Sequence, residues 1–263
     1  MNDSPPLLSA EELSKSYGGV RAVRGVSFKL FAGEILALIG PNGAGKSTCF
    51  DMLNGQTIPD AGRVTLSGQD ITGKKPREVW RLGVGRTFQI TATFATMTVR
   101  ENVQLALASY ERKSLNPATS LPRFSFGEAD RLLELVGMNG LAEQPCGELA
   151  YGDLKRLELA VALANQPRLL LMDEPTAGMT PRERIELMRL TVQIAQTKSI
   201  GVLFTEHDMD VVFGHANRVL VLNRGVLIAE GAPEDIRRND QVRAAYLGGG
   251  LAYDARPGEA RAP

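Results

Sequence analysis

The segment from Ile35 to Thr48 reads ILALIGPNGAGKST and joins a short apolar run to a glycine-rich turn. Residues 35–39 are all apolar without polar alternation, which is typical of a strand buried on both faces of a parallel sheet. Residues 40–48 fit G-x-x-x-x-G-K-[ST], a motif that is informative between a strand and a helix. A helix is expected from Ser47 to about Leu53. The segment therefore predicts a phosphate-binding loop in an α/β fold.

The residue types of this loop suit a bound phosphate. Glycines let the backbone turn its N–H groups inward, and the following helix directs the positive end of its dipole at the anion. Lys46 is expected to contact the β- and γ-phosphates of a nucleotide, and the Ser47 hydroxyl to bind Mg²⁺. The alternative is a glycine-rich turn without a ligand, which the complete motif in this setting disfavours. The predicted nucleotide-binding residues of the loop are Gly40, Pro41, Asn42, Gly43, Ala44, Gly45, Lys46, Ser47 and Thr48.

Two acidic residues follow a second apolar run, at residues 169–172. In an open parallel sheet ligands bind at the carboxyl ends of the strands, so Asp173 is expected to face the same Mg²⁺ as Ser47. Glu174 is predicted to orient or deprotonate the attacking water. Taken alone, such a pair more often caps a helix where a strand leaves the sheet. The phosphate loop upstream is what favours a catalytic role.

Two further polar residues carry a weaker signal. His207 follows the apolar run at residues 200–204 and is expected to hydrogen-bond the γ-phosphate or the attacking water. Gln89 follows the strand-like residues 84–88, and its amide is a candidate ligand of Mg²⁺ or water. A lone histidine is more often structural, which is how His215 is interpreted. The predicted catalytic residues are then Lys46, Glu174 and His207, and the predicted metal ligands are Ser47, Gln89 and Asp173.

The remaining patterns favour an α/β fold with a helical insertion. Capping-box sequences at Thr98 and Thr180 predict a helix over residues 102–108 and another running to about residue 196. Short apolar runs on both sides of Asn223-Arg224-Gly225 predict a hairpin. Residues 109–147 are mostly polar with a helical pattern, which indicates the insertion, and residues 248–263 are expected to form a mobile tail.

Composition excludes several classes of protein. The chain has 263 residues, 43% hydrophobic and 23% charged, values of an ordinary folded protein of one to two domains. Its 30 basic and 30 acidic residues cancel, so no global field favours nucleic acid or an anionic membrane. Two cysteines favour a reducing compartment, and neither a secretory signal nor a membrane-spanning run is expected. We expect a cytoplasmic protein; if it works at a membrane, other chains must do the spanning.

Five segments in one order together resemble an ABC-type nucleotide-binding subunit over residues 8–248. They are the phosphate loop, Gln89 within GRTFQ, LAYGD at residues 149–153, the acids Asp173 and Glu174, and His207. The resemblance implies a P-loop NTPase of ABC type, with a parallel-sheet core, an antiparallel β part and an inserted helical subdomain. The domain is expected at residues 1–247 and the helical subdomain at about residues 90–165. ATP and Mg²⁺ are the implied ligands, and two copies are expected to enclose two ATP molecules.

The segment LAYGD corresponds to the family's signature, which caps the γ-phosphate of ATP bound by the second subunit. The usual signature is LSGGQ. Ala150 lacks the serine hydroxyl, so backbone N–H groups and the helix dipole must supply more of the contact, and Asp153 adds an acid near a polyanion. Tyr17 corresponds to the aromatic residue that stacks on adenine, the alternative being a partly buried loop tyrosine. The implied signature residues are Leu149, Ala150, Tyr151, Gly152 and Asp153.

Several segments narrow the resemblance to ATP-binding subunits of importers for branched-chain amino acids. They are Tyr151 in the signature, DEPTAGMTP from residue 173, TEHDMDVVF from residue 205 and the closing AAYLG. AGMT replaces the frequent SALD after the acids, so a carboxylate there cannot link the two ATP sites. The implied role is ATP hydrolysis that powers uptake, at the cytoplasmic face of the inner membrane. The implied partners are two polytopic permease subunits, a second ATP-binding subunit, identical or different, and an extracytoplasmic solute-binding protein.

Other functions stay open at this point. Importers of urea and short amides share much of the pattern, and the subunit of an exporter would look much alike. A soluble ABC ATPase acting on nucleic acid usually has two cassettes or a long coiled-coil insertion; with one phosphate loop and no basic stripe, no nucleic-acid partner is expected. A regulator that binds without hydrolysis is disfavoured by Glu174 and His207. Residues 89–99 resemble the surface that receives the membrane subunit, the alternative being an ordinary loop.

Overall fold

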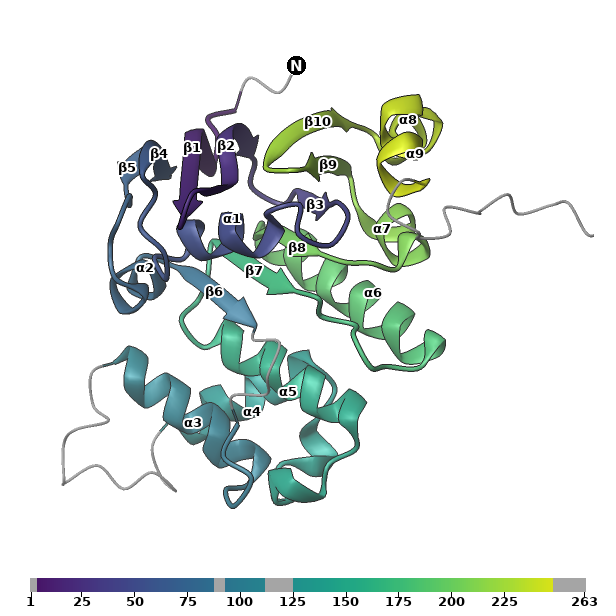
Figure 1. The fold of residues 1–263 in the computed structure, drawn as a ribbon. Helices are drawn as coiled ribbons and strands as arrows, with labels where there is room; N and C mark the ends of the chain where they lie inside the picture. Colours follow the sequence, from purple (N-terminus) through teal and green to yellow (C-terminus); the bar gives the residue numbers. More distant parts are fainter. Residues whose placement is uncertain (1–3, 88–92, 112–124, 248–263) are drawn as a thin grey trace, which may run out of the picture.

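Two sheets form the framework of the computed structural model, which describes residues 4–87, 93–111 and 125–247 (Figure 1). The larger sheet has the strand order β10-β9-β3-β8-β7-β6. Its neighbours pair in parallel, except that β9 and β10 form the predicted antiparallel hairpin. Its strands are β3 (Ile35–Ile39), β6 (Val84–Thr87), β7 (Leu169–Asp173), β8 (Gly201–Thr205), β9 (Arg218–Asn223) and β10 (Val226–Gly231).

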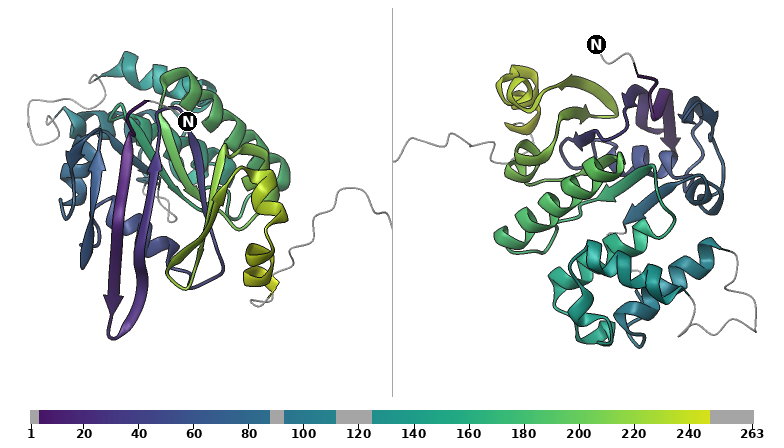
Figure 2. Two further views of the ribbon diagram at one scale, coloured as in Figure 1. Left: turned by 90° about the horizontal axis from the view of Figure 1, so that it is seen from above. Right: turned by 180° about the vertical axis from the view of Figure 1, so that it is seen from behind.

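The smaller sheet is antiparallel, in the order β2-β1-β4-β5. Its register shifts several times along β1, which interrupts the alternation of buried and exposed residues. Figure 2 shows the two longest strands, β1 and β2, side by side in purple. The strands are β1 (Leu8–Tyr17), β2 (Val20–Leu30), β4 (Ala61–Leu66) and β5 (Gln69–Asp70).

The strand that precedes the phosphate loop is buried on both faces because each face belongs to a different core. Ile35, Ala37 and Ile39 of β3 join a core with the helices on one side of the parallel sheet. Leu36 and Leu38 join a second core. This second core also contains α1 (Lys46–Leu53) and the inner face of the antiparallel sheet. The absence of polar residues in residues 35–39 therefore reflects two apolar environments, as predicted from the sequence.

Helices cover the other face of the parallel sheet and extend into a separate layer. The first core takes in residues of α5 (Tyr151–Leu163), α6 (Pro181–Lys198) and α7 (Met209–His215). Two more helices, α3 (Val99–Tyr110) and α4 (Phe126–Leu135), pack with α5 into the teal layer at the bottom of Figure 1. The remaining helices are α2 (Pro76–Arg81), α8 (Pro233–Arg238), α9 (Asp240–Leu247) and the short η2 (Asn139–Leu141) and η3 (Cys146–Glu148).

The fold class expected from the sequence is confirmed: a parallel core, an antiparallel part and inserted helices. Both capping boxes form, since Glu101 and Glu183 return a side-chain oxygen to Thr98 and Thr180. The first helix begins at Val99, three residues before the expected start, because Thr98 is its N-cap, and both helices run two residues past their expected ends. The tail at residues 248–263 lies outside the described residues. Within the described ranges, no helix is both long enough and apolar enough to cross a membrane.

Candidate active site

Three neighbouring strands deliver the predicted site residues to one edge of the sheet. In the strand order β8 lies between β3 and β7, and both of these pairs are parallel. The phosphate loop leaves the carboxyl end of β3, Asp173 and Glu174 stand at the end of β7, and His207 follows β8. This is the edge at which parallel α/β sheets bind their ligands.

The backbone of the phosphate loop approaches neighbouring carbonyl groups so closely at Gly40 and Gly45 that neither position has room for a side chain. Gly45, the N-cap of α1, has φ of +103°, and a Cβ there would lie 2.3 Å from the carbonyl oxygen of Ala22. A Cβ on Gly40 would lie 2.1 Å from the carbonyl oxygen of Leu222. The first turn of α1 carries no acidic residue, so its N–H groups and dipole are left for another anion. The start of α1 fits a phosphate.

Lys46 is a buried cation whose hydrogen-bond acceptors, within the described part of the chain, are neutral carbonyl oxygens. Its side chain is 8% exposed, and Nζ donates to the carbonyl oxygens of Gly40 (2.7 Å) and Pro41 (3.2 Å). Burial lowers the pKa of Lys46, while the negative charges of Glu174 and Asp173 oppose that shift. A desolvated ammonium gains from a further anion within reach. The buried ammonium of Lys46 therefore favours a bound phosphate over a loop without a ligand.

The acid pair is fixed to the neighbouring strand by one threonine. The Thr205 hydroxyl donates to Asp173 Oδ1 at 2.6 Å and accepts from the backbone N–H of Glu174 at 3.0 Å. Glu174 has φ of +47°, a left-handed conformation that is strained for a residue with a side chain. Its N–H also faces the Thr205 carbonyl oxygen at 3.2 Å. The turn that directs the Glu174 carboxylate out of the sheet is thus held by hydrogen bonds from β8.

His207 pairs with Glu174. Its Nε2 lies 2.8 Å from Glu174 Oε1, which joins the imidazole to the predicted base. The expectation from the sequence placed the imidazole on the γ-phosphate or the attacking water, and the structure adds this contact within the protein. Both side chains are partly exposed, so water can reach the pair. A carboxylate hydrogen-bonded to an oriented imidazole suits proton transfer from water.

Two residues near the acids are additions to the predicted site. Arg86 at the end of β6 donates from Nη1 to Asp51 Oδ1 (3.1 Å) and to Gln56 Oε1 (2.8 Å), and its Nη2 lies 3.9 Å from Asp173 Oδ2. Thr205 is the other addition. Its position directly before Glu206 and His207, at the end of an apolar run, is the one signal that pointed to it. Nothing in the sequence pattern distinguished Arg86.

The signature segment begins α5 without a side-chain cap. Ala150 is the N-cap, with φ −63° and ψ 152°, and no side-chain cap hydrogen bond. Tyr151 is 43% exposed, and its ring lies so close to Gly178 that a Cβ there would be 3.2 Å from Cε1. A Cβ on Gly152 would be 2.7 Å from Glu183 Oε1. In the part of the chain that the structure describes, no hydrogen bond or ion pair joins residues 149–153 to residues 40–48.

The two remaining predicted residues have different outcomes. Tyr17 ends β1 and is 49% exposed, so a ligand can reach part of its side chain. Its hydroxyl lies 3.4 Å from Thr57 Oγ1, and the Lys15 ammonium lies 5.7 Å from the ring centroid. Gln89 lies outside the described residues.

A phosphate loop, an acid pair and a histidine on adjacent strand ends define a class of nucleotide-hydrolysing protein, and comparison with known families makes it specific. The model described as "ABC transporter" matches residues 23–177, more than half of the chain, and the chain belongs to that family. It is the ATP-binding subunit, the part that hydrolyses ATP. A second model, "Branched-chain amino acid ATP-binding cassette transporter", matches residues 226–252.

Individual relatives cover almost the whole chain. The high-affinity branched-chain amino acid transport ATP-binding protein LivG of Escherichia coli is 39% identical over 252 residues, 93% of this chain and 99% of that protein. The lipopolysaccharide export system ATP-binding protein LptB of Acidithiobacillus ferridurans is 36% identical over 242 residues, 92% of this chain and 97% of that protein. A solved ATP-binding cassette of an ABC transporter in its ADP conformation superimposes with a TM-score of 0.83 at 30% identity. It matches over 93% of this chain and all of that chain.

Proposed function

We propose that this chain hydrolyses ATP at the edge formed by β3, β7 and β8, with Glu174 as the general base. The observation that carries the proposal is the 2.8 Å contact between Glu174 and His207, beside the buried Lys46. His207 orients the carboxylate, and the carboxylate takes a proton from the attacking water. Lys46 holds the β- and γ-phosphates and stabilises the charge that develops on them.

Mg²⁺ fits the same site. Magnesium in such sites is held by one or two protein oxygens together with phosphate oxygens, and it neutralises charge on the phosphates. Ser47 stands in the first turn of α1, and Asp173 carries a carboxylate held at the edge of the sheet by Thr205. We assign the metal to Ser47 and Asp173, with Gln89 as a further ligand.

A second ATP-binding subunit completes the site. The start of α5 has no side-chain cap, and its Asp153 N–H bonds to the Ala150 carbonyl oxygen, so the N–H groups of Tyr151 and Gly152 are the ones left for an anion. This end makes no hydrogen bond to its own phosphate loop within the described chain. In a dimer the residues 149–153 of one copy would reach the γ-phosphate held by the other. Tyr17, which is half exposed, would stack on adenine.

The transported solute is a branched-chain or related amino acid in this proposal, and the direction is import. Two findings support it: the identity with LivG and the match of residues 226–252 to the branched-chain family. Two polytopic permease subunits would bind the ATPase at the cytoplasmic face of the inner membrane, and a solute-binding protein would serve them from outside. Phe94, 55% exposed ahead of α3, belongs to the surface that we assign to the permease.

Substitution of the base tests the catalytic assignment. Glu174→Ala should abolish ATP turnover and leave ATP binding intact, because the carboxylate acts on water and not on the phosphates. Turnover would be followed by phosphate release and binding by a fluorescent ATP analogue. Glu111→Ala, which changes an exposed glutamate at the end of α3, is the matched control and should have the wild-type rate. Normal turnover in Glu174→Ala would reject Glu174 as the base.

Export is the second candidate, since LptB belongs to an export system and is 36% identical. The tagged chain, recovered from gently solubilised membranes of its own source, separates the two. Two polytopic proteins with a second ATPase and a solute receptor would support import, and binding assays on the receptor would then name the solute, including urea or a short amide. Recovery with lipid-export components would support export, and recovery of nucleic acid without a membrane protein would contradict transport.

A further inference from the structure

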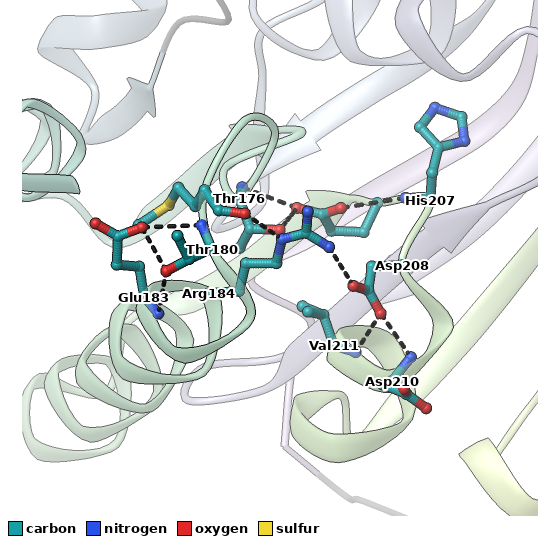
Figure 3. A network of polar contacts seen from close by, with 10 residues as sticks. Thr176, Thr180, Glu183, Arg184, His207, Asp208, Asp210 and Val211 are labelled. Atoms are coloured by element: carbon teal, nitrogen blue, oxygen red, sulfur yellow. Dashed lines mark hydrogen bonds and ion pairs between the residues drawn. The ribbon is translucent and has the colours of Figure 1, made fainter. Parts of the chain in front are cut away.

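A second carboxylate lies buried behind the catalytic pair. Glu206, between Thr205 and His207, is 4% exposed. Its Oε1 accepts from the backbone N–H of Thr176 at 2.9 Å and from the Thr176 hydroxyl at 2.6 Å. Its Oε2 accepts from the backbone N–H of His207 at 3.2 Å. Figure 3 draws these bonds as dashed lines, with Thr176 and His207 at their ends.

The two residues that Glu206 holds belong to the two loops of the catalytic pair. Thr176 follows Glu174 by two residues on the loop after β7, and His207 carries the imidazole on the loop after β8. Oε1 of Glu206 accepts from the loop after β7, and Oε2 accepts from the loop after β8. Burial of a carboxylate is costly unless it is hydrogen-bonded, and here it is offset by three donors from these two loops.

We propose that Glu206 is a positioning residue, which keeps Glu174 and His207 in register by clamping their loops to one rigid carboxylate. The inference rests on the proposed roles of Glu174 and His207. It assigns a function to a residue that touches neither the nucleotide nor water in that proposal. Glu206 acts through the backbone: it fixes where each loop leaves its strand, and so fixes the 2.8 Å contact between the two side chains.

A second brace lies on the same loops and makes the clamp more rigid. Arg184 in the first turns of α6 donates from Nε to the Met179 carbonyl oxygen (2.8 Å) and from Nη1 to Asp208 Oδ2 (2.6 Å). Asp208 follows His207 and caps α7 through Oδ1, which accepts from the N–H groups of Asp210 and Val211. Figure 3 shows Arg184 reaching from the α6 side to Asp208. The loop after β7 is thus tied to the loop after β8 on both sides of His207.

The isosteric variant Glu206→Gln breaks the clamp. An amide has one oxygen acceptor and one NH₂ donor, so it cannot accept from both Thr176 and the His207 N–H. We expect kcat for ATP hydrolysis to fall about tenfold, because coupled residues in one hydrogen-bond network show losses of this size. The affinity for an ATP analogue should stay within about twofold, because the phosphate loop is untouched. Thr176→Val should lose part of the rate, and Thr176→Ser, which keeps the hydroxyl, should restore it.

A double-mutant cycle on the purified full-length protein separates positioning from simple stabilisation. In the His207→Ala background there is no imidazole to align, so Glu206→Gln should lower the rate by less than about twofold. Glu78→Gln, at the capping box of α2 where the carboxylate also accepts a backbone N–H, is the matched control and should change nothing. Melting temperatures show whether each variant is folded at the assay temperature.

Three outcomes contradict the inference. A full additional loss from Glu206→Gln in the His207→Ala background would show that Glu206 does not act through His207. A lower melting temperature with an unchanged kcat would reduce Glu206 to a structural residue. A wild-type rate in His207→Ala itself would reject the proposed role of His207, and the inference with it. The rate of ATP hydrolysis in His207→Ala alone thus distinguishes failure of the proposed function from failure of the proposed role of Glu206.

Discussion

The strand-end site and the signature differ in how completely one chain satisfies them. At the strand ends, Thr205 and Glu206 occupy the polar atoms around the acids and the histidine, and Lys46 is bonded to its own loop. The start of α5 has no side-chain cap, and Tyr151 is exposed beside it. A catalytic apparatus has to be rigid before substrate arrives. A surface that binds a second chain instead leaves helix N–H groups without a side-chain cap until that chain arrives. The difference therefore separates the part that one chain completes from the part that needs a partner.

The largest expected effect comes from removing the buried cation. Lys46→Met keeps the length of the side chain and should lower the affinity for ATP at least about a hundredfold, because the charge-assisted contact with phosphate is lost. The same change should leave the free protein as stable as before or more stable, since burial lowers the pKa of Lys46 and so penalises its charged form. Isothermal titration and thermal denaturation measure the two effects. Lys29→Met, on the exposed side of β2, is the control; a loss of stability in Lys46→Met with normal ATP affinity would contradict the assignment.

The next effect concerns the threonine that links the two strands. Thr205→Val keeps the shape and removes the hydroxyl that holds Asp173 and the N–H of Glu174. We expect about a tenfold lower kcat, and a loss of stability of about 1–2 kcal/mol from the unsatisfied groups. Thr191→Val is a matched control, because Thr191 is equally buried and its hydroxyl donates to the Leu187 carbonyl oxygen within α6. It should lower stability alone; an equal loss of rate in both variants would show that the effect is not local to the site.

A smaller effect tests whether the start of α5 is truly uncapped. Ala150 has the extended backbone of an N-cap, so Ala150→Ser should supply the missing hydroxyl and stabilise the free protein by about 0.5–1 kcal/mol. Urea unfolding measures the gain, and Ala150→Val, which offers no oxygen, should give none. No gain from serine would mean that the N–H groups at this end already have partners, and the comparison with the strand ends would fail.

The smallest expected effect is on the pH dependence of stability, and it distinguishes His215 from His207 of the site. Burial lowers the pKa of His215 below its usual 6.5, so the unfolded state binds more protons than the folded state in this range. Stability should therefore fall as pH decreases below about 6.5, and His215→Asn should flatten that slope. Urea unfolding between pH 7 and pH 5 measures it. ATP hydrolysis in His215→Asn should match the wild type at pH 7.5, and a change in rate would give His215 a role at the site.

The sequence was most informative where one residue type has one physical use. The fully apolar run at residues 35–39 predicted β3 because a strand between two cores has no polar face. The capping boxes predicted the starts of α3 and α6 because threonine and glutamate satisfy each other there. The glycines of the phosphate loop are likewise required by its backbone.

The roles of the other site residues depend on which strands become neighbours in the sheet. Thr205 and Glu206 gain their roles only when β8 lies beside β7, and a threonine in an apolar run is otherwise an ordinary strand residue. Arg86 reaches Asp51 and Gln56 across separate elements, with no local pattern to show it. The register shifts of β1 interrupt its alternation of buried and exposed residues, so this strand has no regular two-residue pattern in the sequence.

Alternate residues of β3 pack into two different cores, and this affects how the molecule unfolds. Since Leu36 and Leu38 anchor the antiparallel sheet while Ile35, Ala37 and Ile39 anchor the helix-covered side, neither side can melt and leave the other intact. Amide hydrogens of β3 should exchange with solvent only through global unfolding, the slowest route available. The same alternation holds for β7, β8 and β9, so the phosphate loop starts from one of a group of slowly exchanging strands, while the start of α5 should exchange by local fraying. Deuterium uptake resolved along the chain would show that gradient directly.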